Sequence, residues 1–185
     1  MPYQPPRINH QLDFSTRTIH GGQSHDPTTG AVMVPIYATS TFAQSSPGVH
    51  KGWEYGRTHN PTRQAFERAI ADLESGAAGF AFASGLAAIA NILETLDHGA
   101  HIVASDDLYG GTFRLIDKVR RRSAGLDVSF ADFRDPASIE AAIRPETKLI
   151  WVETPTNPML KIVDLQAIAA IGRKRGIVTV ADNTF

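Results

Sequence analysis

The sequence predicts an α/β protein whose mostly parallel sheet is covered by helices on both faces. Short apolar runs alternate with stretches of helical periodicity from about residue 61 onward. The run Leu149–Val152 is apolar throughout, and Ile177–Ala181 is apolar except for Thr179, as is typical of strands buried on both faces. The 185 residues are 42% hydrophobic and 20% charged, an ordinary composition for a globular protein long enough to bury a core.

The first 60 residues predict an irregular arm rather than a packed layer. They are rich in Pro, Gly, Thr, His and Ser and show little periodicity. Order begins at Asn60, a helix N-cap residue type, with Pro61 at the first helical position. We therefore expect an arm over residues 1–60 and an ordered α/β domain over residues 61–185.

Helices and strands then follow one another along the chain. Apolar residues at helical spacing, with Gly or Pro near the ends, predict helices over residues 61–73, 86–96, 112–122, 136–143 and 165–174. Short apolar runs between them predict strands over residues 79–83, 101–104, 127–131, 148–152 and 177–181. This alternation is typical of βα units in a parallel sheet.

Several classes of protein are disfavoured by composition. A net charge of -1 offers no bulk attraction for nucleic acid or an anionic membrane, and the basic cluster at residues 118–122 fits a solvated helix end. The absence of cysteine excludes disulfides and thiol chemistry in this segment, and the seven histidines show no metal-ligand spacing, so no metal is expected. Without a membrane-length apolar run or a signal peptide, a cytoplasmic protein is expected.

Two segments are suited to a phosphate. Ser84-Gly85-Leu86 lies where a strand turns into a helix, so free N–H groups and the positive end of the helix dipole are available. A plain turn fits this tripeptide as well, and neither a Walker motif nor G-x-G-x-x-G is present. Tyr55 and Arg57 would point to one side of an extended chain and could grip a phosphate together. A surface ion pair beside a half-buried aromatic is the alternative.

Three more segments are suited to a planar, charged ligand. Tyr109 precedes Gly110 and Gly111, which remove bulk from beside its ring, although a simple turn would also place glycines there. The stretch Glu153-Thr-Pro-Thr-Asn-Pro158 follows one apolar strand, and Asp182 ends another. A carboxylate there needs a cation such as a protonated pyridine nitrogen, unless it caps a following helix.

Taken together and in order, these motifs resemble the Cys/Met-metabolism family of enzymes that depend on pyridoxal 5'-phosphate (PLP). The family includes cystathionine γ-lyase, γ-synthase and β-lyase and methionine γ-lyase. The resemblance covers nearly all of the chain after about residue 15 and is carried by Thr18–Gly22, Pro35–Phe42, Tyr55–Arg57, Asn60–Thr62, Ser84–Leu86, Asp107–Thr112, Glu153–Pro158 and Asp182–Phe185.

The resemblance implies the aspartate aminotransferase-like fold type I, with the C-terminal domain absent from this chain. Residues 61–185 would then form an incomplete part of the large PLP-binding domain. The arm over residues 1–60 would reach the active site of the neighbouring subunit in a homotetramer of two catalytic dimers.

The resemblance also implies a role for each motif. Gly85 and Leu86 would hold the cofactor phosphate through backbone N–H groups, and Tyr55 and Arg57 would reach it from the neighbouring subunit. Tyr109 would stack on the pyridine ring of the cofactor and help to transfer a proton.

Four further residues complete the implied site. Asn157 would bind the phenolic oxygen of the cofactor, and Asp182 would pair with its ring nitrogen. Thr184 would lie close to the ring, and Arg114 would lie near the distal end of the substrate.

Two departures from the family pattern are visible. Gly56 stands where the family usually has Ser. The Schiff-base lysine of the family lies downstream of the Asp182–Phe185 motif, and none of the lysines in this chain matches it: Lys51, Lys118, Lys148, Lys161 and Lys174. We therefore expect the 185 residues alone to be inactive.

The function implied by the resemblance is transsulfuration. Cystathionine γ-lyase, which cleaves cystathionine to cysteine, 2-oxobutanoate and ammonia, is favoured, with cystathionine γ-synthase as the alternative. Gly111 disfavours methionine γ-lyase, which usually has Cys there. A different class, a non-catalytic fragment that binds a cofactor or a partner, stays open because the lysine is missing, and a dehydrogenase is disfavoured because its glycine fingerprint is absent.

Overall fold

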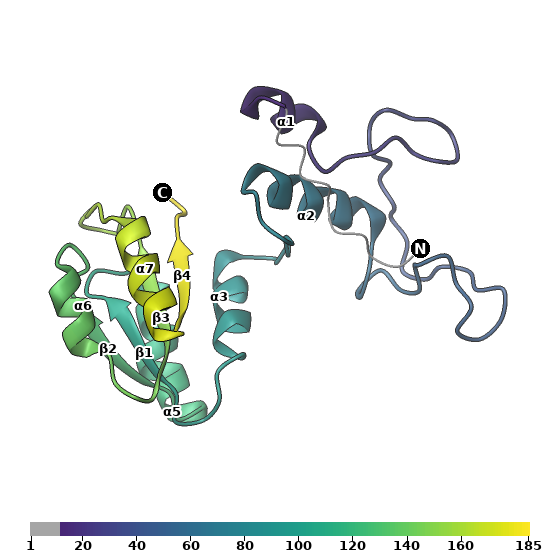
Figure 1. Ribbon diagram of the computed structural model, residues 1–185. Coiled ribbons are helices and arrows are strands. Elements are labelled where there is room, and N and C mark those ends of the chain that lie inside the picture. Colours follow the sequence, from purple (N-terminus) through teal and green to yellow (C-terminus); the bar gives the residue numbers. More distant parts are fainter. Residues whose placement is uncertain (1–11) are drawn as a thin grey trace. The chain divides into compact units, whose positions relative to one another are not determined.

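The computed structural model describes residues 12–185 and separates into two compact units, one ending at Phe82 and the other beginning at Ala83 (Figure 1). The first unit contains helices α1 (Phe14–His20) and α2 (Pro61–Leu73), with a long irregular stretch between them. Residues 1–11 of the expected arm lie outside the described residues. In this chain α2 packs against α1 and so belongs to the first unit. The expected division into an arm over residues 1–60 and a domain over residues 61–185 stays a prediction for the whole protein.

The second unit is built on a parallel sheet of four strands. Its order is β2-β1-β3-β4, and each neighbouring pair runs parallel. The bounds of the strands are β1 (His101–Ser105), β2 (Asp127–Ala131), β3 (Thr147–Glu153) and β4 (Val178–Asp182). The α/β class with a parallel sheet, predicted from the sequence, is confirmed.

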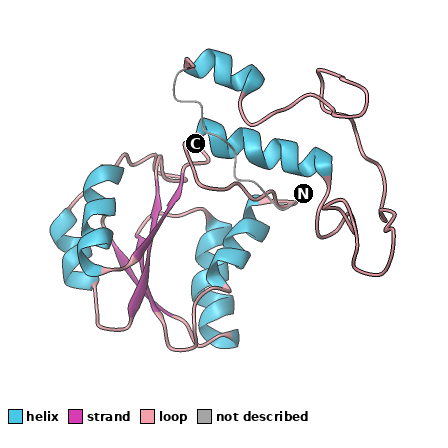
Figure 2. Cartoon of the chain, turned by 45° about the vertical axis from the view of Figure 1, so that its right-hand side comes forward, coloured by secondary structure: helices cyan, strands magenta, loops and turns pink. Residues whose placement is uncertain are grey.

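Helices cover both faces of this sheet (Figure 2). On one face, α3 (Gly85–Leu93) and the helical stretch α4 (Gly110–Phe113), η1 (Arg114–Arg120) and α5 (Arg121–Ser123) enclose a core around Trp151. On the other face, α6 (Pro136–Ala142) and α7 (Leu165–Arg175) pack on Ile150 and Val152. Because successive residues of β3 alternate between these cores, the strand needs apolar residues throughout.

The strand predicted over residues 79–83 is wrong. Phe80 is 78% exposed, and no strand among residues 12–185 pairs with this segment. The N–H of Ala81 donates instead to the carboxylate of Glu67, at 3.0 Å. An apolar run forms a strand only where a neighbour completes its hydrogen bonds, and the composition of the run cannot show that neighbour.

The helix predicted over residues 112–122 forms over residues 110–123, but its middle differs from an ordinary helix. Arg114–Arg120 is wound as a π-helix. Such widened segments are rare and are frequent near functional sites. Here the segment starts five residues after Tyr109, and apolar periodicity alone predicted no change in winding.

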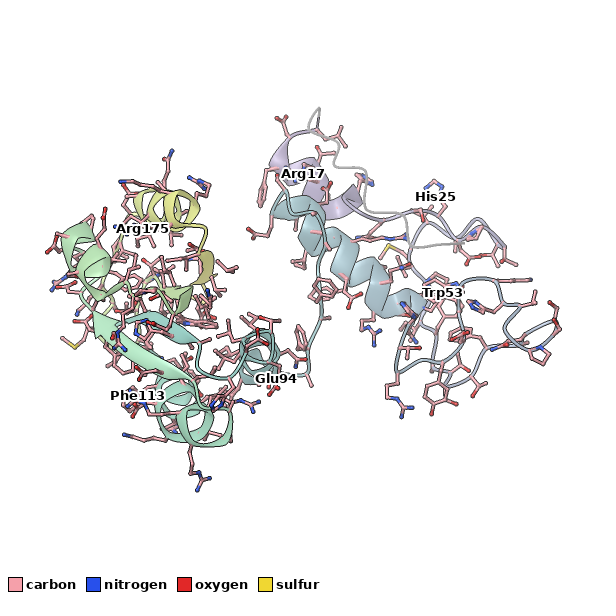
Figure 3. All side chains as sticks on the ribbon, turned by 60° about the horizontal axis from the view of Figure 1, so that its bottom comes forward. Arg17, His25, Trp53, Glu94, Phe113 and Arg175 are labelled. Atoms are coloured by element: carbon pink, nitrogen blue, oxygen red, sulfur yellow. The ribbon has the colours of Figure 1, made fainter. Side chains whose placement is uncertain are left out.

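Helix α1 lies in the stretch that was predicted to be irregular, so that part of the prediction is wrong. None of its residues is buried, and its N-cap Asp13 makes no capping hydrogen bond through its side chain. Arg17, labelled in Figure 3, pairs instead with the buried Asp72 of α2 at 3.0 Å. A tertiary ion pair thus holds a helix that local sequence signals do not mark.

A buried histidine lies at the amino end of the sheet. The Nδ1 atom of His101 is 2.7 Å from Thr147 Oγ1, and its Nε2 is 3.0 Å from Ser129 Oγ. Burial lowers the pKa of His101, and the charge of Arg144 lowers it further, while Asp127 and Glu146 oppose this shift. The imidazole therefore bridges two strands in its neutral form.

This burial makes stability dependent on pH. The unfolded imidazole takes up a proton near pH 6.5, its ordinary pKa, whereas the folded one does so only at lower pH. Below pH 6.5 the unfolded chain therefore binds more protons, and the free energy of unfolding should fall as pH falls. Urea titrations at several pH values should show a shallower fall in His101→Asn, while His25→Asn, at an exposed histidine, should keep the wild-type slope. Equal slopes in all three proteins would contradict this assignment.

Candidate functional site

Several polar residues of the second unit that the sequence motifs contain lie at the carboxyl ends of the strands. Asp106, Asp107 and Tyr109 follow β1, Glu153 ends β3, and Asp182 ends β4. Strand β3 lies between β1 and β4, and its register places Glu153 opposite Asp182. Open parallel sheets bind their ligands at this edge.

Glu153 is the centre of this edge and is only 4% exposed. The backbone N–H of Tyr109 donates to both of its carboxylate oxygens, at 3.1 Å to Oε1 and 2.9 Å to Oε2. The N–H of Asn157 donates to Oε1 at 2.8 Å. Burial raises the pKa of Glu153, and the charges of Asp182 and Asp107 add to this effect, against the two N–H donors.

The loop after β3 is fastened to the loop after β1. The hydroxyl of the buried Thr156 donates to Asp107 Oδ2, which also accepts the N–H of Met159 at 3.0 Å. Lys161 Nζ lies 2.8 Å from both oxygens of Asp106. These contacts, together with Glu153, hold Asn157 in a defined place beside Tyr109.

The side chain of Tyr109 is 47% exposed and lies over a glycine. A Cβ atom added to Gly111 would lie 3.0 Å from Tyr109 Cζ and closer still to Cε1. A Cβ atom on Gly110 would meet only the far end of the Arg114 side chain, at 3.3 Å. The structure thus supports the predicted reason for a glycine after Tyr109 and assigns it to Gly111.

The N-terminus of α3 is open. The hydroxyl oxygen of Ser84 caps the helix by accepting the N–H of Ala87 at 3.1 Å. A Cβ atom added to Gly85 would meet no heavy atom within 4 Å, and Leu86 is 42% exposed. The first N–H groups of a helix have no acceptor within it, and α3 packs against α4, which follows Tyr109 directly. An anion thus has access to this helix start.

Asp182 and Thr184 form a small unit of their own. The hydroxyl of Thr184 donates to Asp182 Oδ1 at 2.6 Å, and its N–H donates to the same oxygen at 3.2 Å. Asp182 is half-buried, and no cation pairs with it among residues 12–185. Thr184 therefore fixes the orientation of the Asp182 carboxylate through Oδ1.

Tyr55 and Arg57 lie in the first unit and contact each other. The guanidinium of Arg57 lies 5.0 Å from the centre of the Tyr55 ring. The expectation of an extended chain through both residues is wrong, because the chain turns after Tyr55, whose carbonyl accepts the N–H of Thr58 at 3.1 Å. A Cβ atom on Gly56 would lie 2.7 Å from the Thr39 carbonyl oxygen, so this departure from the family pattern matches a close backbone approach.

Three residues that organise the edge were missed by the sequence reasoning. Glu153, Asp107 and Thr156 occur within the motifs that were singled out, but no role was predicted for any of them. The signal for Glu153 was available, because a carboxylate at the end of an apolar strand is costly unless bonded, the same reasoning that singled out Asp182. For Thr156 and Asp107, which lie 49 positions apart, the sequence held no signal.

A hollow of about 570 Å³ lies at the opposite, amino end of the sheet, lined in part by Leu96, His98, Pro145 and Val178. It contains none of the predicted site residues. Although this hollow is large, it is not the candidate site, since the polar groups that could orient a charged ligand lie at the carboxyl edge of the sheet.

No helix within residues 12–185 is long and apolar enough to cross a membrane.

Known proteins resemble this chain over nearly its whole length. It is 59% identical over 177 residues to a cystathionine β-lyase of Coxiella burnetii, covering 96% of this chain and 46% of that protein. It is 53% identical over 175 residues to a cystathionine γ-synthase of Mycobacterium bovis, covering 92% and 44%.

A solved structure, cystathionine γ-lyase from Lactobacillus plantarum complexed with L-serine, superposes with a TM-score of 0.89 at 51% identity, covering 93% of this chain and 45% of that one. The chain thus spans a little under half the length of these relatives and has the fold of type I PLP enzymes over that part. The model of the Cys/Met metabolism PLP-dependent enzymes matches residues 15–185, and the chain belongs to this family.

Proposed function

We propose that the carboxyl edge of the sheet binds PLP in the whole protein. The observation that carries this proposal is the arrangement of Tyr109, Asn157 and Asp182 at one sheet edge, the first two joined through Glu153. Gly85 and Leu86 would hold the phosphate, and Tyr109 would cover the ring. Asn157 would bind its phenolic oxygen, and Asp182, oriented by Thr184, would pair with its nitrogen.

The residues present fit this cofactor. The open space at Gly85 admits a phosphate to the helix start. The exposed ring of Tyr109 offers a flat surface. The carboxylate of Asp182 has no cation partner among the described residues. Each end of the cofactor would therefore meet a group of matching chemistry.

When bound, PLP supplies a ring that withdraws electrons from the substrate carbons next to the amine. The chain's own residues would hold that ring and its protons. Asp182 would keep a proton on the ring nitrogen, and the N–H groups of Gly85 and Leu86 would fix the phosphate. The Tyr109 hydroxyl would move a proton near the substrate.

The reaction that we propose for the whole protein is cleavage of a carbon–sulfur bond in cystathionine, with γ-elimination first, as in cystathionine γ-lyase. The relative with 59% identity, a cystathionine β-lyase, supports β-elimination as the second candidate. Gamma-synthase activity is the third. Arg114 would face the distal end of the substrate. We also propose a homotetramer in which Tyr55 and Arg57 reach the phosphate of the neighbouring subunit.

The keto acid produced from cystathionine separates these reactions. With the whole protein and PLP, 2-oxobutanoate indicates γ-elimination, whereas pyruvate indicates β-elimination. Production of cystathionine from an acylated homoserine and cysteine, without cleavage, indicates the synthase. If the protein binds PLP but forms none of these products, the lyase proposal is contradicted and the non-catalytic class remains.

A further inference from the structure

We infer that Glu153 is a positioning residue that sets Tyr109 and Asn157 relative to each other. This rests on the proposed function, which makes these two residues the ring contacts of PLP. Glu153 itself is only 4% exposed, and its carboxyl group accepts hydrogen bonds from their backbone N–H groups.

The geometry makes one carboxylate the common acceptor for two loops. Tyr109 follows β1 and Asn157 follows β3, and they lie 48 positions apart in the numbering. Both N–H groups donate to Oε1, at 3.1 and 2.8 Å, while Oε2 accepts from Tyr109 at 2.9 Å. A shift of the carboxylate therefore moves both backbones together.

The surroundings show that Glu153 does more than fill space. No cation pairs with it among the described residues, and the two other carboxylates that act on it, Asp182 and Asp107, disfavour its charge. A residue that served packing alone would be apolar here, because burying an unpaired charge is costly. What the buried carboxyl group provides here is an acceptor for the N–H groups of Tyr109 and Asn157.

The experiment is hydrogen exchange, followed by mass spectrometry at single-residue resolution, on the whole protein without cofactor. Glu153→Ala should speed exchange at the amides of Tyr109 and Asn157 about tenfold or more, because both lose their buried carboxyl acceptor. Exchange in β1 should not change. Glu140→Ala, at an exposed residue that pairs with Arg175, is the matched control and should leave both amides as in the wild type.

A conservative variant gives the sharper result and covers the case in which Glu153→Ala does not fold. In Glu153→Gln the amide oxygen satisfies two donors if it occupies the Oε1 position. Exchange should then rise at Tyr109, which keeps Oε1 at 3.1 Å but loses its shorter hydrogen bond to Oε2 at 2.9 Å, and should not rise at Asn157. A merely structural role predicts the same change at both amides, or in β1 as well, and this would overturn the inference.

The affinity of the site for the cofactor without a Schiff base is measured separately with pyridoxine phosphate. In this analogue an alcohol replaces the aldehyde, so that no lysine is needed. Glu153→Ala should weaken its binding about tenfold, and Glu153→Gln should restore most of the affinity. If the wild type binds none while the amide result holds, the proposed function fails and the positioning role stands. If the wild type binds but the amides of Tyr109 and Asn157 exchange at the wild-type rate in both Glu153 variants, the positioning role fails.

Discussion

Replacing Gly111 with alanine is expected to displace the ring of Tyr109 and to weaken the binding of pyridoxine phosphate by up to about tenfold. The added Cβ atom would overlap the ring at Cε1 and lie 3.0 Å from Cζ. Tyr109 is the flat surface on which the cofactor ring would lie, so a displaced tyrosine loses the stacking contact. Isothermal titration of pyridoxine phosphate measures the loss.

Gly110→Ala is the matched control for this prediction. It adds the same methyl group one position earlier, where it meets only the flexible end of Arg114 at 3.3 Å. It should therefore bind pyridoxine phosphate as the wild type does. If Gly111→Ala also binds normally, the ring of Tyr109 does not contact the cofactor.

Replacing Asp182 with alanine is expected to weaken pyridoxine phosphate binding roughly ten- to hundredfold, because hydrogen bonds to charged groups contribute about 1.5–3 kcal/mol. Asp182 is oriented by Thr184, whose hydroxyl lies 2.6 Å from Oδ1. Thr184→Ala should give a smaller loss, since the carboxylate stays but is less well held. Absorption and calorimetric titrations both report the affinity.

The control for charge is Asp97→Ala, an exposed aspartate at the other end of the sheet. It changes the net charge equally and should not change the affinity. An unchanged affinity in Asp182→Ala would mean that this carboxylate does not pair with the ring nitrogen. A loss in both variants would point to bulk charge instead.

The elements that the sequence predicted well are those whose pattern depends on local burial. Strand β2 was predicted with the bounds it has, Asp127–Ala131, and helix α2 was found from its cap at Asn60. The wrong predictions concern segments whose structure depends on residues far away in the sequence. Residues 79–83 lack a neighbouring strand among residues 12–185, and α1 is held by an ion pair between positions 17 and 72.

The residues of the candidate site also fall into those that the sequence predicted and those that it did not. Tyr109, Asn157 and Asp182 were predicted because their motifs occur in a recognisable order, and the structure brings them to one edge of the sheet. Glu153 was missed because its role comes from two backbone N–H groups on different loops. No side-chain pattern in a sequence reports where backbone N–H groups will converge.

The most direct test of the proposed cofactor site is a map of the amides that pyridoxine phosphate protects from hydrogen exchange in the whole protein. Protection should be found at Gly85 and Leu86, at Tyr109, at Asn157 and over residues 182–184. Protection that is absent from these residues, or that lies at the amino end of the sheet around Leu96 and Pro145, would contradict the proposed site.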